Sequence, residues 1–205
     1  MRAIGTAAIA MLPLLAGSTA PSAQQGTPDR LPQSIASSFR ARGQADLDRL
    51  QQTPMQLACS TAQPGALPPD VRDRIEREAL QRVRFPDDGR WLGNWERGER
   101  IAQQGGGLQY SDSPEAPRGG NCYGCHRLSG SEIAYGTIGP SLYRYRQRIG
   151  QGDQAMRRTW IRIWNPHALN ACSMMPRFGD AGILTTEQLR DVMALLFDPG
   201  SPVNR

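Results

Sequence analysis

The sequence has few of the residues that build metal clusters and disulfide frameworks. Its 205 residues include four cysteines, two histidines and no lysine, so arginine supplies all 24 basic side chains. Four cysteines are too few for a disulfide scaffold, and a charged content of 21% does not indicate a disordered chain. The arginines alternate with acidic residues, as in RDRIEREALQRVR (72–84). This alternation is typical of a solvated helix face and argues against nucleic-acid binding.

Long apolar runs are also scarce, apart from one at the start of the chain. Arg2 precedes an apolar run over residues 3–15, and small residues follow up to Ala20 or Ala23. This order predicts a secretory signal peptide over residues 1–23, with an apolar run too short to span a bilayer. An uncleaved amphipathic anchor is the alternative, but the stretch lacks the polar face that it would need. We therefore expect a periplasmic protein without a membrane span.

Strand-like alternation and internal repeats are missing as well, so the expected fold class is mainly α. Twenty-two glycines and 16 prolines predict long irregular connections between the helices. Residues 53–70 are expected to form a loop, and Thr185 and Gln188 have capping-box spacing. Helices are expected over 35–52, 70–85, 91–104, 153–165 and 185–198. We divide the mature chain into an N-terminal extension (24–90) and a main domain (91–205).

The motif with the clearest chemistry is GNCYGCHRLSG (120–130), which places Cys122, Cys125 and His126 together. A redox CxxC pair usually opens a helix after a strand, and no strand pattern precedes this one. A zinc site would need a fourth ligand and normally a second pair of cysteines, whereas Cys59 and Cys172 stand alone. The third interpretation is c-type haem attachment, in which both thiols form thioethers with the haem and the histidine ligates iron. We favour this third interpretation.

A second iron ligand is expected from ALNACSMMPRFGDAG (168–182). A thioether opposite the histidine raises the reduction potential of the haem and suits one-electron transfer. Met175 is the favoured ligand because the following Pro176 biases it towards an extended backbone. Met174 is expected to pack elsewhere, since methionine commonly fills gaps in a core. His167 is the remaining candidate, and we expect it to be a surface or loop histidine instead.

Residues around the haem can be predicted from the same segment. A ligating histidine usually donates its other ring N–H to a carbonyl. The segment TIGPSL (137–142) lies close enough in the chain for Pro140 to offer its carbonyl to His126, although Gly139-Pro140 could form a simple turn. We expect apolar walls and hydrogen bonds to the propionates from Trp160, Tyr143 and Tyr145, and neutralising charge from Arg127, Arg144 and Arg146.

The two remaining cysteines, Cys59 and Cys172, have a different expected role. In an oxidising compartment two spare cysteines are more often bridged than free. Their bond would close a loop of over a hundred residues, worth up to ~4–5 kcal/mol in the chain-entropy model. It would also tie the extension to the segment that carries Met175. The alternative is a pair of free thiols.

The motifs GNCYGCH, TIGPSL, WIRIWNP, SMMPRFG and LTTEQLRDVMALL occur in the order found in class I cytochromes c. The sequence resembles that family over residues 91–198. The resemblance implies helices wrapped round one covalent haem c, with Cys122 and Cys125 as attachment points and His126 and Met175 as axial ligands. Within the family, the MMPRFG segment, IGPSL and the long exported extension are most similar to SoxX, the monohaem subunit of SoxAX complexes.

That narrower resemblance implies a function and a set of partners. SoxX forms a heterodimer with the dihaem cytochrome SoxA, and the complex is an L-cysteine S-thiosulfotransferase that oxidatively joins thiosulfate to a cysteine of the SoxYZ carrier. The catalytic centre is then expected on SoxA, while this chain accepts electrons and passes them to a downstream cytochrome. One alternative is a free soluble electron shuttle. A further one is a haem enzyme with an open site, if Met175 dissociates easily.

Overall fold

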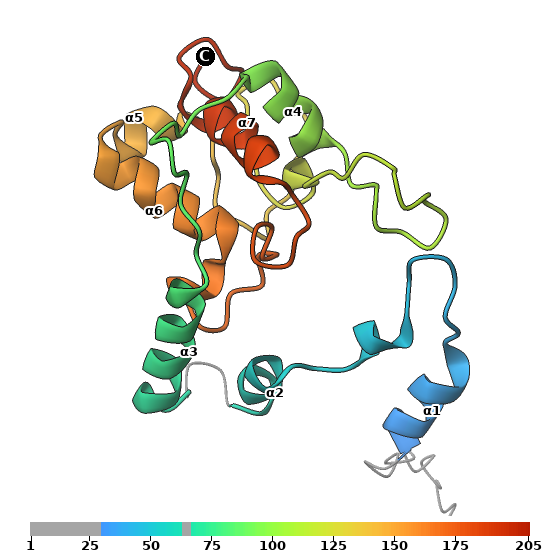
Figure 1. The fold of residues 1–205 in the computed structure, drawn as a ribbon. Coiled ribbons are helices and arrows are strands. Elements are labelled where there is room, and N and C mark those ends of the chain that lie inside the picture. The colour runs from blue at the N-terminus through green and yellow to red at the C-terminus, as the bar shows by residue number, and fades with distance from the viewer. Residues whose placement is uncertain (1–29, 63–66) are drawn as a thin grey trace, which may run out of the picture. The chain divides into compact units, whose positions relative to one another are not determined.

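The computed structural model describes residues 30–62 and 67–205. Within these ranges the regular structure is helical and no strand occurs, apart from an isolated bridge between Arg42 and Ala45 (Figure 1). The prediction of a mainly α protein is confirmed. No helix in the described ranges has the length and apolar character needed to cross a membrane. The expected signal peptide, residues 1–23, lies outside the described residues.

The helices fall in two compact units, residues 1–38 and 39–205. The first unit contains α1, and the second contains all the other elements. The helices are α1 (Arg30–Ser38), α2 (Pro54–Thr61), α3 (Pro69–Gln81), α4 (Trp95–Gln103), α5 (Tyr145–Ile149), α6 (Asp153–Trp164) and α7 (Thr186–Phe197), with 3-10 turns η1 (Leu47–Leu50), η2 (Cys122–Gly124) and η3 (Pro166–Ala168).

The expected helix over 35–52 is wrong. Helix α1 ends at Ser38, and the chain then turns through Gly43, whose φ of +55° lies in the left-handed region. A Cβ at Gly43 would also lie 2.2 Å from the carbonyl oxygen of Tyr110, so this backbone approach requires glycine. Helical structure resumes only as the single turn η1.

The expected loop over 53–70 is also wrong, because it contains α2. Thr53 accepts a hydrogen bond from the amide of Gln56, whose side chain caps the amide of Thr53 in return, and Pro54 occupies the first helical position. This reciprocal capping box satisfies amides that the first turn would otherwise leave unpaired. The signal was present in the sequence as T-P-M-Q.

The remaining four predicted helices are present as α3, α4, α6 and α7. Their apolar faces meet in one core, in which Trp160, Leu189 and Met193 are fully buried. The indole N–H groups of Trp160 and Trp164 donate to the carbonyls of Arg84 and Arg82, at 2.8 and 3.1 Å. The chain just after α3 is therefore hydrogen-bonded to α6.

Helices α4 and α7 cross at close range (Figure 1). Asp191 of α7 is buried and accepts hydrogen bonds from the amide of Asn94 at 2.8 Å and from Nε and Nη2 of Arg97 at 2.7 and 2.8 Å. At the crossing point, a Cβ on Gly98 would lie 2.1 Å from the carbonyl oxygen of Asp191. The two backbones thus approach closely because residue 98 has no side chain.

Candidate functional site

The CxxCH motif is fixed to the C-terminal end of α4. The amides of Gly120 and Asn121 donate to the carbonyls of Ile101 and Gln104, both at 2.8 Å. Asn121 then takes a left-handed φ of 46°, which turns the chain into η2. The amide of His126 donates to the carbonyl of Cys122 at 2.9 Å. The start of the motif is therefore held in space by α4, the helix that crosses α7.

The His126 ring is held by the turn that follows it. Its Nδ1 lies 2.7 Å from the carbonyl oxygen of Pro140. Because a carbonyl can only accept, Nδ1 carries a proton, and in the neutral ring Nε2 then keeps its lone pair. The structure thus brings together the histidine and the carbonyl that the sequence analysis paired. This tautomer is the one in which an imidazole ligates a metal through Nε2.

Gly139 was not singled out in the sequence analysis beyond its place in a turn, and the structure gives it a specific role. Its amide donates to the carbonyl of Cys125 at 2.8 Å, and its Cα faces the His126 ring so closely that a Cβ would lie 2.1 Å from Cε1. The turn therefore packs against one side of the imidazole while Pro140 holds its edge. A glycine before a proline downstream of CxxCH was the only available signal.

The two thiols of the motif have properties that discriminate among its uses. Cys122 and Cys125 are not bonded to each other. Burial of its sulfur raises the pKa of Cys122 to about 12, and the neighbouring Cys125 adds to the shift. A redox CxxC instead depends on a thiol whose pKa is lowered. In the described part of the chain, no group of three or more His, Cys, Asp or Glu side chains could hold a metal ion. The raised pKa of Cys122 disfavours the redox interpretation.

The segment with the candidate methionines is an irregular loop between α6 and α7. Met175 is half-buried and, like Cys122, packs against the buried core. Phe178 and Cys122 both lie beside Gly120, since a Cβ at Gly120 would be 3.2 Å from Cys122 Sγ and 3.6 Å from Phe178 Cε1. The loop and the CxxCH motif are therefore neighbours. Met174 is 90% exposed, so the prediction that it packs elsewhere is wrong.

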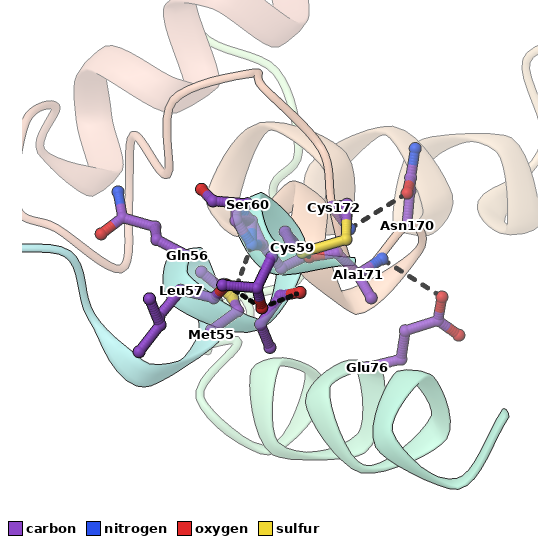
Figure 2. Close-up of a disulfide and its surroundings, with 12 residues drawn as sticks. Met55, Gln56, Leu57, Cys59, Ser60, Glu76, Asn170, Ala171 and Cys172 are labelled. Carbon is purple, nitrogen blue, oxygen red and sulfur yellow. Dashed lines mark hydrogen bonds between the residues drawn. A yellow bond between two sulfur atoms is a disulfide. The ribbon is translucent and has the colours of Figure 1, made fainter. Parts of the chain in front are cut away.

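The structure contains the disulfide between Cys59 of α2 and Cys172, with a sulfur–sulfur distance of 2.02 Å (Figure 2). Nearby, the amide of Ala171 donates to Glu76 Oε1 at 3.3 Å. Disulfides persist mainly in oxidising, extracytoplasmic compartments, and this bond indicates such a location for the protein. Glu76 was not anticipated, because nothing in the sequence pairs α3 with this loop.

His167 is not the surface histidine that the sequence analysis expected. It is buried in η3, where its Nδ1 lies 2.8 Å from Met55 Sδ. Burial lowers the pKa of His167, and Arg177 and Arg82 lower it further, while Asp180 opposes them. His167 is thus a structural contact between α2 and the loop after α6.

All three aromatic residues assigned to the haem wall use their polar atoms within the protein. The buried Tyr145 hydroxyl lies 2.9 Å from Thr159 Oγ1, and the Trp160 indole donates to Arg84. The Tyr143 hydroxyl accepts from Arg144 Nε at 3.1 Å. The prediction that Trp160 and Tyr145 hydrogen-bond propionates is therefore wrong, because these side chains belong to the core.

The lowered pKa of His167 predicts a pH-dependent stability. Its unfolded pKa is near 6.5 and its folded pKa is lower, so the unfolded chain binds more protons between the two values. The free energy of unfolding should be highest above pH 6.5 and fall as the pH is lowered through this window, by at most about 1.4 kcal/mol per unit. Urea unfolding between pH 7.5 and 5 measures it. His167→Gln should have a flatter profile, and equal slopes would contradict the assignment.

No family model matches the chain, but it is similar to a known protein. An "Uncharacterized lipoprotein" of Aquifex aeolicus (strain VF5) is 36% identical over 154 residues, which cover 73% of this chain and 71% of that protein. Identity at this level over most of both chains reflects a shared fold and common descent. The chain belongs to the same protein family as this Aquifex aeolicus lipoprotein.

Proposed function

We propose that this protein is an exported monohaem cytochrome c that accepts and passes on single electrons. In this proposal Cys122 and Cys125 attach the haem, and His126 and Met175 are the axial ligands. The observation that carries the proposal is the His126 ring, whose Nδ1 proton is held by Pro140 so that Nε2 is available as a ligand. Two unbonded thiols beside it, in a chain whose other two cysteines are bonded, fit the same chemistry.

The residues present fit a bound haem in three further respects. The Pro140 carbonyl would make the imidazole more basic and prevent its rotation. Ile138 is 77% exposed beside Gly139, and such an apolar surface is what a macrocycle would cover. Met175 lies on a loop adjacent to the motif through Gly120 and Phe178. When bound, the haem would supply one-electron chemistry, with a thioether ligand favouring a high potential.

For the fold, we propose the class I cytochrome c arrangement over residues 91–205, preceded by an extension over 24–90. The helix order supports it. The motif follows α4, the methionine segment lies between α6 and α7, and α7 crosses α4 at Gly98. For location we propose the periplasm. The disulfide and the lipoprotein relative, a class of protein carried across a membrane, both support export.

We further propose that the protein is a SoxX-like subunit of a SoxAX complex, with SoxA as its partner, SoxYZ as the substrate carrier and a cytochrome as the downstream acceptor. No thiol remains in this chain for thiosulfate transfer, because two cysteines would attach haem and two form a disulfide. Bond formation would therefore occur on the partner. This chain would hold the electron-accepting haem and would bind to the partner subunit.

A cluster of arginines beside the motif supports docking to an acidic partner. Arg127 lies over the Tyr135 and Tyr143 rings, at 4.9 and 5.4 Å from their centroids, and Arg144 lies 5.2 Å from that of Tyr143. Among the described residues, no carboxylate forms an ion pair with Arg127, Arg144, Arg146 or Arg148. Unpaired, stacked arginines are well suited to steer and bind an acidic surface.

The second candidate function is a free electron shuttle without an enzymatic role. The same arginine cluster would serve brief docking, so it does not separate the two functions. Purification of the protein from its native host separates the two functions. Stable co-purification with a dihaem cytochrome supports the SoxAX subunit, whereas a protein isolated repeatedly as a monomer at low salt supports the shuttle.

The cytochrome assignment itself is tested by removing the attachment points. The wild-type chain, exported in a host with a c-type maturation system, should retain haem through a denaturing gel. Cys122→Ser/Cys125→Ser should lose all of it. Cys59→Ser/Cys172→Ser is the matched control, because it also removes two cysteines but should keep the haem. Retention of covalent haem by Cys122→Ser/Cys125→Ser would overturn the assignment.

A further inference from the structure

The backbone around Met175 is weakly held. In this loop, which the structure describes completely, the amides of Met174, Arg177 and Phe178 have no hydrogen-bond partner. Pro176 has no amide hydrogen, and the amide of Met175 reaches only Ser173 Oγ at 3.3 Å. Without a ladder of internal hydrogen bonds, the position of the Met175 side chain depends on how the two ends of the loop are fixed.

The C-terminal end is fixed to the main core. The amides of Gly179 and Asp180 donate to the carbonyl of Trp164 at 3.2 and 3.1 Å. Gly179 also packs on the Trp164 indole, since a Cβ there would lie 2.4 Å from Cδ2. The Asp180 carboxylate accepts from Asn165 Nδ2 at 3.2 Å. This anchor involves only residues of the main domain.

The N-terminal end, by contrast, is fixed by the extension. Cys172, three residues before Met175, is bonded to Cys59, and the preceding amide of Ala171 donates to Glu76 (Figure 2). Further back, His167 contacts Met55 of α2. These partners all precede residue 90, outside the stretch that resembles cytochromes c. The amides of Cys172 and Ser173 also donate locally to Asn170, at 3.2 and 3.0 Å. The extension therefore supplies the long-range attachments at this end of the methionine loop.

We propose that the Cys59–Cys172 disulfide is a clamp that keeps Met175 on the haem iron, and that reducing it opens this axial position to external ligands. The inference rests on the proposed haem function and adds to it a regulation of the same site. Cys172 is exposed, so a thiolate can reach the bond. A dithiol reductant would break the sulfur–sulfur bond by exchange. It would give up two electrons and two protons, leave both cysteines as thiols and itself become a disulfide.

A purely structural disulfide would have a different signature. It would change the unfolding midpoint of the protein without changing what binds to iron. The clamp instead predicts a spectroscopic and ligand-binding change in a protein that is still folded and still carries its haem. Thr53→Ala separates the two cases. It removes the capping box of α2 and so lowers stability, but it leaves the disulfide in place, so ligand binding at the iron should not change.

The experiment uses the haem-loaded full chain and two readouts. One is the weak far-red band of thioether-ligated ferric haem, and the other is CO binding to the ferrous protein. Cys59→Ser/Cys172→Ser should keep covalent haem, lose much of the band and bind CO with roughly tenfold higher apparent affinity, as expected for a tenfold larger open fraction. Wild-type protein treated with dithiothreitol should gain the same CO binding, and Thr53→Ala should resemble untreated wild type.

The outcomes separate this inference from the proposed function. Unchanged CO binding in both the double variant and the reduced wild type, with Met175→Ala losing the band, would overturn the clamp alone. Retention of the band in Met175→Ala would remove the methionine assignment and the clamp with it. A wild-type chain without covalent haem would overturn both proposals. The reduction of wild type keeps the test valid if the double variant fails to fold.

Discussion

Gly139→Ala should displace the His126 ring and so disturb its proposed ligation of haem iron. The added Cβ would lie 2.1 Å from Cε1 and 2.4 Å from Nδ1 of the imidazole. The ring cannot give way without losing its hydrogen bond to Pro140, which fixes its orientation. Overpacking of this kind typically costs about 1–3 kcal/mol, and here the strain falls on the ligand itself.

Absorption spectra and thermal unfolding of the haem-loaded variant measure this effect. We expect a disturbed axial-ligand spectrum together with a lower unfolding midpoint. Gly152→Ala is the control, because a Cβ at that position meets no atom within 4 Å. A Gly139→Ala protein with the spectrum and midpoint of wild type would show that the His126 ring does not pack against this turn.

Gly98→Ala should destabilise the protein although alanine is the better helix former. In an exposed helix this exchange would be favourable by about 1 kcal/mol. At the crossing of α4 and α7, however, the new Cβ would lie 2.1 Å from the carbonyl oxygen and 2.6 Å from the carbonyl carbon of Asp191. A backbone contact cannot be relieved by a rotamer change, so the helices must separate and weaken the hydrogen bonds of Asp191 to Asn94 and Arg97.

The expected loss for Gly98→Ala is about 1–3 kcal/mol in the free energy of unfolding, measured by urea denaturation. The motif should respond as well, because Gly120 and Asn121 are bonded to the end of α4. We therefore expect less efficient haem attachment than in Gly152→Ala. An unchanged or raised urea midpoint would contradict the close crossing.

The parts of the fold that could be predicted from sequence are those with local signals. The apolar faces of α3, α4, α6 and α7 repeat at helical spacing, and Thr185 and Gln188 form the capping box that their spacing predicts. Helix α3 begins at Pro69, one residue before the expected Asp70. Helix α2 was missed because the prolines and glycine near it outweighed the capping signal at Thr53.

The failures concern contacts between distant segments. The helix expected over 35–52 is interrupted where Gly43 meets the backbone of Tyr110, and no local pattern reveals that approach. His167 was expected as a surface or loop histidine, yet it is buried and its ring contacts Met55. Met174 and Met175 are identical in type, and only the path of the loop decides that the first is exposed and the second is half-buried.

The candidate site has a stronger local signal in the sequence than the fold around it. The chemistry of Cys122, Cys125 and His126 is encoded in five consecutive residues, and Pro140 follows at a short distance along the chain. The packing of Gly139 against the His126 ring could not be predicted from the sequence, because a glycine before proline is common in turns. The contacts of Glu76 and Met55 could not be predicted from the sequence either, because their partners lie about a hundred residues away along the chain.

The central claim, that the CxxCH motif carries a covalent haem, is tested most directly by the intact mass of the exported protein under denaturing conditions. The account predicts a mass equal to that of the processed chain plus one haem, with the added mass on the peptide that contains Cys122 and Cys125 and no free thiol detected by alkylation. A processed chain of unmodified mass, obtained from a host that matures other c-type cytochromes and with Cys122 and Cys125 both alkylated, would contradict it.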